Sequence, residues 1–189
     1  MMKVLVLTGS PHVSGTTALM ADEFIAGAEA AGHEVVRFDT AKMNISPCTG
    51  CGHCRRNKGS CIFNDDMLKI NPHLLESDAV VFVSPLYYFG MTAQLKRTVD
   101  RFFANNTELR GHSKKVYLLA AGADDEDWIM DGVAAHMQTM CRYMNWQYAD
   151  AVLALGAGVP EDLKNSEYLK TTREMGYQIE SGTSLKYRE

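Results

Sequence analysis

The chain alternates between short apolar runs and longer segments in which apolar residues recur every three or four positions. The apolar runs are rich in β-branched residues and predict five buried strands, at 3–8, 34–38, 79–84, 115–120 and 151–155. Strands separated by helices are typical of a parallel sheet that is covered on both faces. The pattern therefore predicts an α/β protein built on a five-stranded parallel sheet.

The segments between these strands have helical periodicity. In the first of them, Met20, Phe24 and Ala28 follow one another at intervals of four, and Gly32 then supplies a residue that can adopt a positive φ at a helix end. The same reasoning predicts helices at 14–31, 66–76, 92–104, 127–143 and 166–181.

The third predicted helix is typical of a helix that covers a sheet. Its apolar residues at 95, 99 and 102 share one face. We expect the charged residues outside that face to be solvated: Lys96, Arg97, Asp100 and Arg101.

Length and composition agree with one globular domain. The 189 residues are 46% hydrophobic and 22% charged, which is enough for a single core and excludes a disordered or low-complexity chain. We find no internal repeat and no interdomain linker. We expect one domain over 1–189, with a cysteine-rich insertion loop at about 44–65.

Charge and hydropathy exclude several classes of partner. The chain has 19 Lys and Arg against 23 Asp and Glu, and no long basic run, which argues against a nucleic-acid surface. The longest apolar runs fall far short of the roughly 20 residues that cross a bilayer. The first run is also too short for a secretory signal. We expect a cytoplasmic protein with no nucleic-acid or membrane partner.

The loop at 9–17, between the first strand and the first helix, is rich in small hydroxyl residues. Such a loop at a helix N-terminus can place backbone N–H groups and hydroxyls around a phosphate, assisted by the helix dipole. The loop lacks the lysine of an ATP-binding P-loop and the glycine spacing of a Rossmann site. The alternative is that Ser14 merely caps the helix.

The segment at 84–91, after the third strand, contains three consecutive aromatic residues: Tyr87, Tyr88 and Phe89. With strand order 2-1-3-4-5, the first and third strands flank the point where ligands bind at the carboxyl edge of the sheet. We expect the two loops to face one ligand, and the aromatic residues to cover a flat ring. The alternative is that these aromatics fill the core or an interface.

Four of the five cysteines fall within 14 residues: Cys48, Cys51, Cys54 and Cys61. They lie in the 44–65 segment, which has neither helical nor strand periodicity, and long loops of this kind are usually functional. In a reducing compartment, such a cluster binds metal or does redox chemistry. The spacing resembles the cysteine run of iron–sulfur proteins more than zinc knuckles. Zinc, with His53 nearby, and metal-free or reversibly oxidised thiols remain alternatives. Cys141 is expected to be a buried packing residue.

Together, these motifs resemble those of the flavodoxin-like NAD(P)H-dependent FMN reductases, and within them the iron–sulfur flavoproteins. The matching segments are 8–11 with 15–17, the cysteine run followed by 65–67, then 84–87 and 96–101. They cover the first 101 residues in the family's order. The remainder of the chain is compatible with the family but not diagnostic.

The resemblance implies a three-layer flavodoxin-like doubly wound sandwich, with strand order 2-1-3-4-5 and noncovalently bound FMN. It assigns the FMN phosphate to the first loop, at Ser10, His12, Ser14, Gly15, Thr16 and Thr17. It assigns the ring to the second loop and to the residues after the fourth strand: Pro85, Leu86, Tyr87, Tyr88, Phe89, Gly90, Ala121 and Gly122. Relatives often have Arg at position 12 and Asn at position 16, so here amides, hydroxyls and His12 would meet the phosphate charge.

The implied activity is an oxidoreductase in which NAD(P)H reduces FMN and the flavin passes electrons to a small-molecule or protein acceptor. No catalytic side chain is required for that step. A [4Fe-4S] cluster on Cys48, Cys51, Cys54 and Cys61 would convert two-electron to one-electron transfer. Alternatives are a nonenzymatic flavodoxin-like or iron–sulfur electron carrier, and a zinc-stabilised binding module. The resemblance also implies a homodimer or homotetramer.

Overall fold

The computed structural model describes residues 1–164 and 166–179. Its strands form one parallel sheet in the order β2-β1-β3-β4-β5, which confirms the predicted fold class and strand order. The strands are β1 (Lys3–Thr8), β2 (Glu34–Asp39), β3 (Ala79–Pro85), β4 (Lys115–Ala121) and β5 (Gln147–Ala154).

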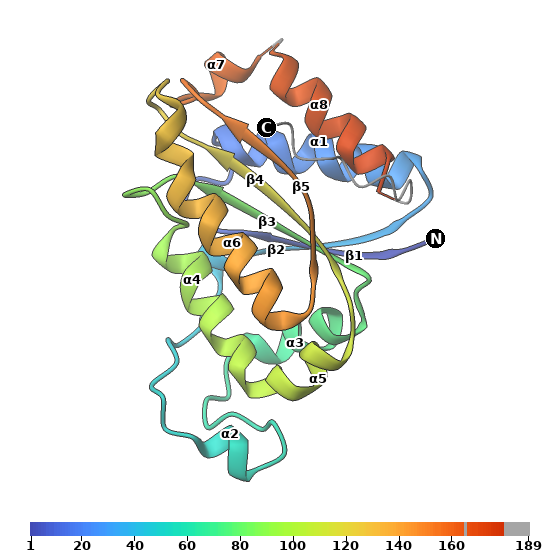
Figure 1. The fold of residues 1–189 in the computed structure, drawn as a ribbon, viewed down its shortest axis with the longest axis vertical. Helices are drawn as coiled ribbons and strands as arrows, with labels where there is room; N and C mark the ends of the chain where they lie inside the picture. The colour runs from blue at the N-terminus through green and yellow to red at the C-terminus, as the bar shows by residue number, and fades with distance from the viewer. Residues whose placement is uncertain (165, 180–189) are drawn as a thin grey trace.

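Helices cover both faces of the sheet (Figure 1). On one face lie α1 (Thr16–Ala30) and α8 (Glu167–Tyr177). On the other lie α3 (Met67–Glu76), α4 (Ala93–Asp100), α5 (Asn106–Gly111) and α6 (Asp131–Met144). Shorter segments join them: η1 (Thr40–Lys42), α2 (His53–Arg56), η2 (Arg101–Asn105), η3 (Asp127–Met130) and α7 (Pro160–Leu163).

The core lies in two layers because strands that are buried on both faces send alternate side chains to opposite sides. In β1, Val4 and Val6 pack on the α1 and α8 side, whereas Leu5 and Leu7 pack on the other. Helices α1 and α8 pack closely against each other at Gly27 of α1 and Gly176 of α8. A Cβ atom at Gly27 would lie 2.0 Å from the Arg173 carbonyl oxygen, so a larger residue would separate the helices.

Several predicted boundaries are wrong in detail. β5 begins at Gln147 instead of residue 151, because its polar first half still pairs with β4 through a register shift. The predicted helix at 92–104 divides into α4, η2 and α5, and the one at 127–143 into η3 and α6. The 3₁₀ turns where these helices begin or end leave no separate signal in apolar periodicity. Residues 180 and 181 of the last predicted helix lie outside the described residues.

Arg97 and Arg101, which we expected to be solvated, instead pack against other parts of the protein. Arg97 donates from Nη2 to the carbonyl oxygens of Thr40 and Met43, at 3.1 and 2.9 Å. Arg101 is buried. The expectation is wrong because the chain after β2 packs against this side of α4: residues 40–43 contact Arg97, and the 44–65 segment contacts Arg101. Lys96 and Asp100, in contrast, remain exposed and pair with each other, as expected.

None of the helices in the described ranges combines the length and apolar character needed to cross a bilayer.

Candidate functional site

A pocket of about 420 Å³ opens at the carboxyl ends of β1, β3, β4 and β5. This volume falls within the roughly 300–1,000 Å³ that is usual for small-molecule sites. Four loops contribute its lining: Ser10, His12, Ser14, Gly15, Thr16 and Thr17; Pro85, Leu86 and Tyr87; Ala121 and Ala123; and Ala157, Gly158 and Pro160. The loops after the first and third strands therefore face one cavity, as predicted.

Helix α1 begins at this pocket with unsatisfied donors. Its N-cap is Gly15, and no side chain caps the helix, so the alternative capping role of Ser14 is wrong. Neither the backbone N–H groups nor the hydroxyls of Thr16 and Thr17 donate to an acceptor among the described residues. Free amides and hydroxyls at the positive end of a helix are suited to the oxygens of a phosphate.

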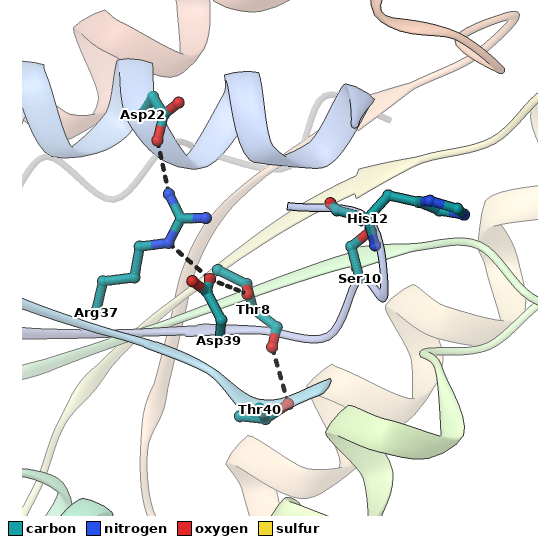
Figure 2. Close-up of polar contacts among 7 residues, drawn as sticks. All are labelled: Thr8, Ser10, His12, Asp22, Arg37, Asp39 and Thr40. Atoms are coloured by element: carbon teal, nitrogen blue, oxygen red, sulfur yellow. Dashed lines mark hydrogen bonds and ion pairs between the residues drawn. The ribbon is translucent and has the colours of Figure 1, made fainter. Parts of the chain in front are cut away.

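The turn before α1 is held in shape by its own side chains. The Ser10 hydroxyl accepts from the His12 backbone N–H and donates to the His12 carbonyl oxygen, both at 3.1 Å. Figure 2 shows the His12 ring extending away from the polar network behind the turn. Both residues line the pocket, so the imidazole is a further polar group at its rim.

A buttress of hydrogen bonds anchors the end of β1 behind this turn (Figure 2). The Thr8 hydroxyl donates to the Asp39 carboxylate at 2.7 Å, and the Thr40 hydroxyl donates to the Thr8 carbonyl oxygen at 2.8 Å. Arg37 donates to Asp39 at 2.8 Å and to Asp22 at 2.6 Å. Burial acts to raise the pKa of Asp39, but the hydrogen bonds from Thr8 and Arg37 outweigh it and lower that pKa.

Thr92 ties the first loop to the third strand. Its hydroxyl donates to the Gly9 carbonyl oxygen at 2.7 Å, and its backbone N–H donates to the Ser84 hydroxyl at 3.0 Å. A Cβ atom at Gly9 would lie 2.5 Å from the Thr92 Oγ1, so glycine permits this close approach. The two loops are therefore fixed to each other before any ligand binds.

The aromatic segment forms a tight two-residue turn. Tyr87 and Gly90 exchange backbone hydrogen bonds at 3.0 and 3.2 Å, and the residues between them have left-handed φ angles of 45° at Tyr88 and 62° at Phe89. This conformation is unfavourable for residues other than glycine. The Phe89 ring packs on Trp128 at 5.1 Å between centroids, whereas Tyr88 is fully exposed to solvent.

The 44–65 segment forms a closed loop that projects beyond α4 and α5 and includes α2 (Figure 1). Its neck is closed because the Asp66 N–H donates to the Asn44 carbonyl oxygen and the Ser46 N–H donates to the Asp65 carboxylate, both at 3.0 Å. Inside the loop, a small pocket of about 30 Å³ is lined by all four clustered cysteines, together with Phe63, Asp100, Arg101, Phe103 and Ala104, among others.

The four thiols are free and are gathered around this pocket. They are not drawn into a preformed ligand set, since the described residues contain no group of three or more His, Cys, Asp or Glu placed to hold a metal. Thiols are the correct donors for an iron–sulfur cluster. Glycines with positive φ at 50, 52 and 59 give the loop its turns around the cysteines. The residue types therefore fit a cluster, and binding it requires the loop to bring its four sulfurs closer together.

The two pockets lie at opposite ends of α4. The helix begins next to Thr92, at the first pocket, and its last residue, Asp100, lines the cysteine pocket. The two pockets share no lining residue. Eight residues of helix at about 1.5 Å each give a separation on the order of 12 Å.

The family model for NADPH-dependent FMN reductases matches residues 2–159. The chain belongs to this family. An iron-sulfur flavoprotein of Archaeoglobus fulgidus is 32% identical over 189 residues, covering 99% of this chain and 83% of the relative. An iron-sulfur flavoprotein of Methanocaldococcus jannaschii is 35% identical over 100 residues, covering 53% of this chain and 51% of the relative. The match with this second relative therefore covers about half of each protein.

Solved structures show the same fold. The NAD(P)H:quinone oxidoreductase of Methanothermobacter marburgensis aligns with a TM-score of 0.71 at 19% identity, over 95% of this chain and 96% of that one. An FMN-dependent NADH-azoreductase of Bacillus anthracis, in complex with FMN, aligns with a TM-score of 0.66 at 14% identity, over 93% of this chain and 98% of that one. Membership of the family makes this protein an NAD(P)H-dependent FMN oxidoreductase.

In this FMN reductase, the structure brings together most of the residues assigned to the flavin. All six from the first loop line the pocket, together with Pro85, Leu86, Tyr87 and Ala121. The other four lie outside its lining: Tyr88, Phe89, Gly90 and Gly122. Gly122 packs instead against the Ile129 side chain, because a Cβ atom at Gly122 would lie 2.8 Å from Cδ1 of Ile129. The exposed turn at 88–89 therefore does not cover the pocket within one chain.

Sequence reasoning missed the contribution of the loop after β5. Ala157, Gly158 and Pro160 line the pocket of the FMN reductase, whereas Ala123 belongs to the loop after β4, which the resemblance had already assigned to the flavin. The signal was present, because a glycine-rich loop follows the fifth predicted strand at the carboxyl edge where ligands bind.

The cysteines of the FMN reductase differ in acidity. A backbone hydrogen bond at His53 is the largest cause that lowers the pKa of Cys51, and the nearby Arg56 charge adds to it. Cys141 is buried in the core, as predicted, and burial raises its pKa to about 12. In the cysteine pocket, burial acts against the charge of Arg101, but Asp65 and, secondarily, Cys61 outweigh it and raise the pKa of Arg101.

Proposed function

We propose that this protein binds FMN in the pocket at the carboxyl edge of the sheet, accepts a hydride from NAD(P)H, and delivers the electrons to a small-molecule or protein acceptor. The observation that supports this most strongly is the set of unsatisfied backbone N–H and hydroxyl donors of Thr16 and Thr17. These two residues line the cavity of about 420 Å³, and the chain belongs to the FMN reductase family.

Different loops of the chain would bind the phosphate and the ring of FMN. The backbone N–H groups and hydroxyls of Thr16 and Thr17, with the Ser14 hydroxyl, would hold the phosphate at the positive end of α1. The segment from Pro85 to Tyr87 and the small residues after β4 and β5 would enclose the ring. FMN, when bound, supplies the hydride chemistry, so the protein needs to bind, orient and shield it without a side-chain acid or base.

The cysteine loop is proposed to hold a [4Fe-4S] cluster on Cys48, Cys51, Cys54 and Cys61. Support comes from the shared pocket of the four thiols and from the iron-sulfur flavoproteins among the relatives. Such a cluster would pass electrons one at a time to a protein acceptor. Analysis of iron, acid-labile sulfide and zinc in protein purified without oxygen tests this assignment. About four irons and four sulfides per chain support it, whereas zinc, or flavin without metal, contradicts it.

A homodimer is the proposed assembly. Tyr88 is fully exposed on a strained turn, next to the partly exposed rings of Tyr87, Phe89 and Trp128. Exposed aromatic patches mark sites of association more often than bare surface does. Analytical ultracentrifugation of the FMN-loaded protein should show a dimer or a dimer of dimers, and a monomer at micromolar concentration would contradict the proposal.

The phosphate cradle can be tested with one isosteric substitution. Thr17→Val removes a hydroxyl that faces the pocket without changing side-chain volume. A hydrogen bond to a charged group contributes about 1.5–3 kcal/mol, so FMN should bind roughly 10- to 100-fold more weakly. Thr172→Val is the matched control, because Thr172 donates its hydroxyl to the Tyr168 carbonyl oxygen within α8 at 2.6 Å and lies outside the pocket. Equal FMN affinity in wild type and Thr17→Val would contradict the assigned phosphate site.

A further inference from the structure

Arg101 holds the neck of the cysteine loop from the end of α4. Its Nη1 donates to the Asp65 carboxylate at 2.6 Å and to the Ser46 carbonyl oxygen at 2.8 Å, and its Nη2 donates to the second Asp65 oxygen at 3.2 Å. Its guanidinium also lies over the Phe63 ring, 5.1 Å from the centroid. Arg101 therefore holds together the two ends of the loop that carries the cysteines.

The same side chain is left with an unused donor. Only 3% of the Arg101 side chain is exposed, and its buried Nε has no hydrogen-bond partner among the described residues. A buried N–H without an acceptor is unfavourable, more so when it belongs to a cation. Arg101 lines the pocket that all four cysteines also line, and Cys61 is one of the groups that raise the pKa of Arg101. The nearest place for a missing acceptor is therefore this pocket.

Iron–sulfur clusters provide acceptors of that kind. Their sulfurs carry negative charge, and hydrogen bonds and positive charges around them raise the reduction potential because they stabilise the more negative reduced state. A guanidinium held rigidly by Asp65 offers both a donor and a charge at a fixed place.

We propose that Arg101 is the positioning residue of the cysteine pocket: it fixes the loop through Asp65 and Ser46, and its Nε–H donates to a sulfur of the cluster held by the four cysteines. This inference rests on the cluster of the proposed function. It assigns to one side chain, at the junction of α4 and η2, the role of keeping the cluster's reduction potential higher than the cysteines alone would set it.

Arg97 provides a matched comparison one helical turn earlier. It lies on α4, donates to the backbone carbonyl oxygens of Thr40 and Met43 in the segment after β2, and, like Arg101, has a buried Nε without a hydrogen-bond partner among the described residues. It does not line the cysteine pocket. A general effect of removing positive charge near the end of α4 would appear in both arginine variants, whereas the effect of a specific contact with the cluster would appear only in the Arg101 variants.

The experiment uses full-length, FMN-loaded protein reconstituted without oxygen with ferrous iron and sulfide. Wild type, Arg101→Gln, Arg101→Lys and Arg97→Gln are compared for iron and sulfide content, for FMN content as a measure of folding, and for the midpoint potential of the cluster. The potential is followed by the electron paramagnetic resonance signal during titration with dithionite.

We expect the midpoint potential to be lower in Arg101→Gln than in wild type, to fall by less in Arg101→Lys, and to be unchanged in Arg97→Gln. If Arg101→Gln does not yield FMN-loaded protein, Arg101→Lys decides, and its potential must still lie below wild type. A loaded wild type with the same potential as both Arg101 variants overturns this inference alone. A similar decrease in Arg97→Gln also overturns it. A wild type that assembles no iron and sulfide contradicts the proposed cluster, and this inference fails with it.

Discussion

Arg101 and Asp65 form a bidentate ion pair that joins the end of α4 to the neck of the cysteine loop, with both side chains almost fully buried, at 3% and 5% exposed. The pair explains why a loop of some twenty residues without helical or strand periodicity has one defined path. It also means that the loop and the end of α4 are energetically coupled.

Asp65→Asn should destabilise the whole domain. Removing one partner of a buried ion pair leaves the other charge uncompensated and costs about 3–5 kcal/mol in the free energy of unfolding. Asp100→Asn is the control, because the exposed pair of Asp100 with Lys96 at i,i+4 is worth only about 0.3–0.5 kcal/mol. Urea denaturation measures both, and equal small losses would contradict a structural role for the buried pair.

The same pair predicts a pH dependence. Burial acts to raise the pKa of Asp65, but the hydrogen bonds from Arg101 and from the backbone at Ser46 and Met67 outweigh it and lower that pKa. A carboxyl with a lowered folded pKa contributes stability above its unfolded pKa of about 3.9, and this contribution is lost as the pH falls through the folded pKa. The stability difference between wild type and Asp65→Asn should therefore be constant near pH 6 and shrink below about pH 4. A difference independent of pH would contradict this account.

The cysteines should separate into two classes of reactivity. In metal-free protein at neutral pH, iodoacetamide should modify the four loop cysteines, with Cys51 first because its lowered pKa gives it the largest thiolate fraction. Cys141 should react only after unfolding, because burial both raises its pKa to about 12 and blocks access. Peptide mass mapping over time distinguishes the sites. Modification of Cys141 as fast as the loop cysteines would show that the core opens.

A substitution at Tyr88 in the aromatic turn should make the isolated chain more stable. Tyr88 has a left-handed φ of 45° and no packing around its ring, and asparagine tolerates this conformation far better than tyrosine. Tyr88→Asn should raise the free energy of unfolding by about 1 kcal/mol in dilute protein. Tyr177→Asn, at an exposed helical position, should give no such gain.

The same substitution also tests the reason for keeping a strained tyrosine. Strain of this kind persists where function requires the side chain. If the turn lies at the dimer contact, Tyr88→Asn should weaken self-association in sedimentation experiments while it stabilises the single chain. Unchanged association would remove Tyr88 from the proposed interface.

The parts of the molecule predicted correctly are those with local signals. Apolar runs located the strands, and the hydroxyl-rich loop after β1 pointed to the unsatisfied start of α1. Arg101 was misplaced because helical periodicity groups it with the charged face, whereas its partner Asp65 lies 36 residues earlier on a loop with no periodicity at all. The left-handed turn at Tyr88 also leaves no sequence signal, since such turns ordinarily carry glycine or asparagine.

The most direct test of the account is an anaerobic titration of the purified, FMN-loaded protein with NADPH and with NADH, followed by the flavin absorbance. The account predicts that FMN binds at a stoichiometry of about one per chain, that NADPH or NADH reduces it stoichiometrically, and that an added electron acceptor then reoxidises it with turnover. A protein that binds no FMN, or whose bound FMN stays oxidised with both nicotinamides, would contradict the central claim.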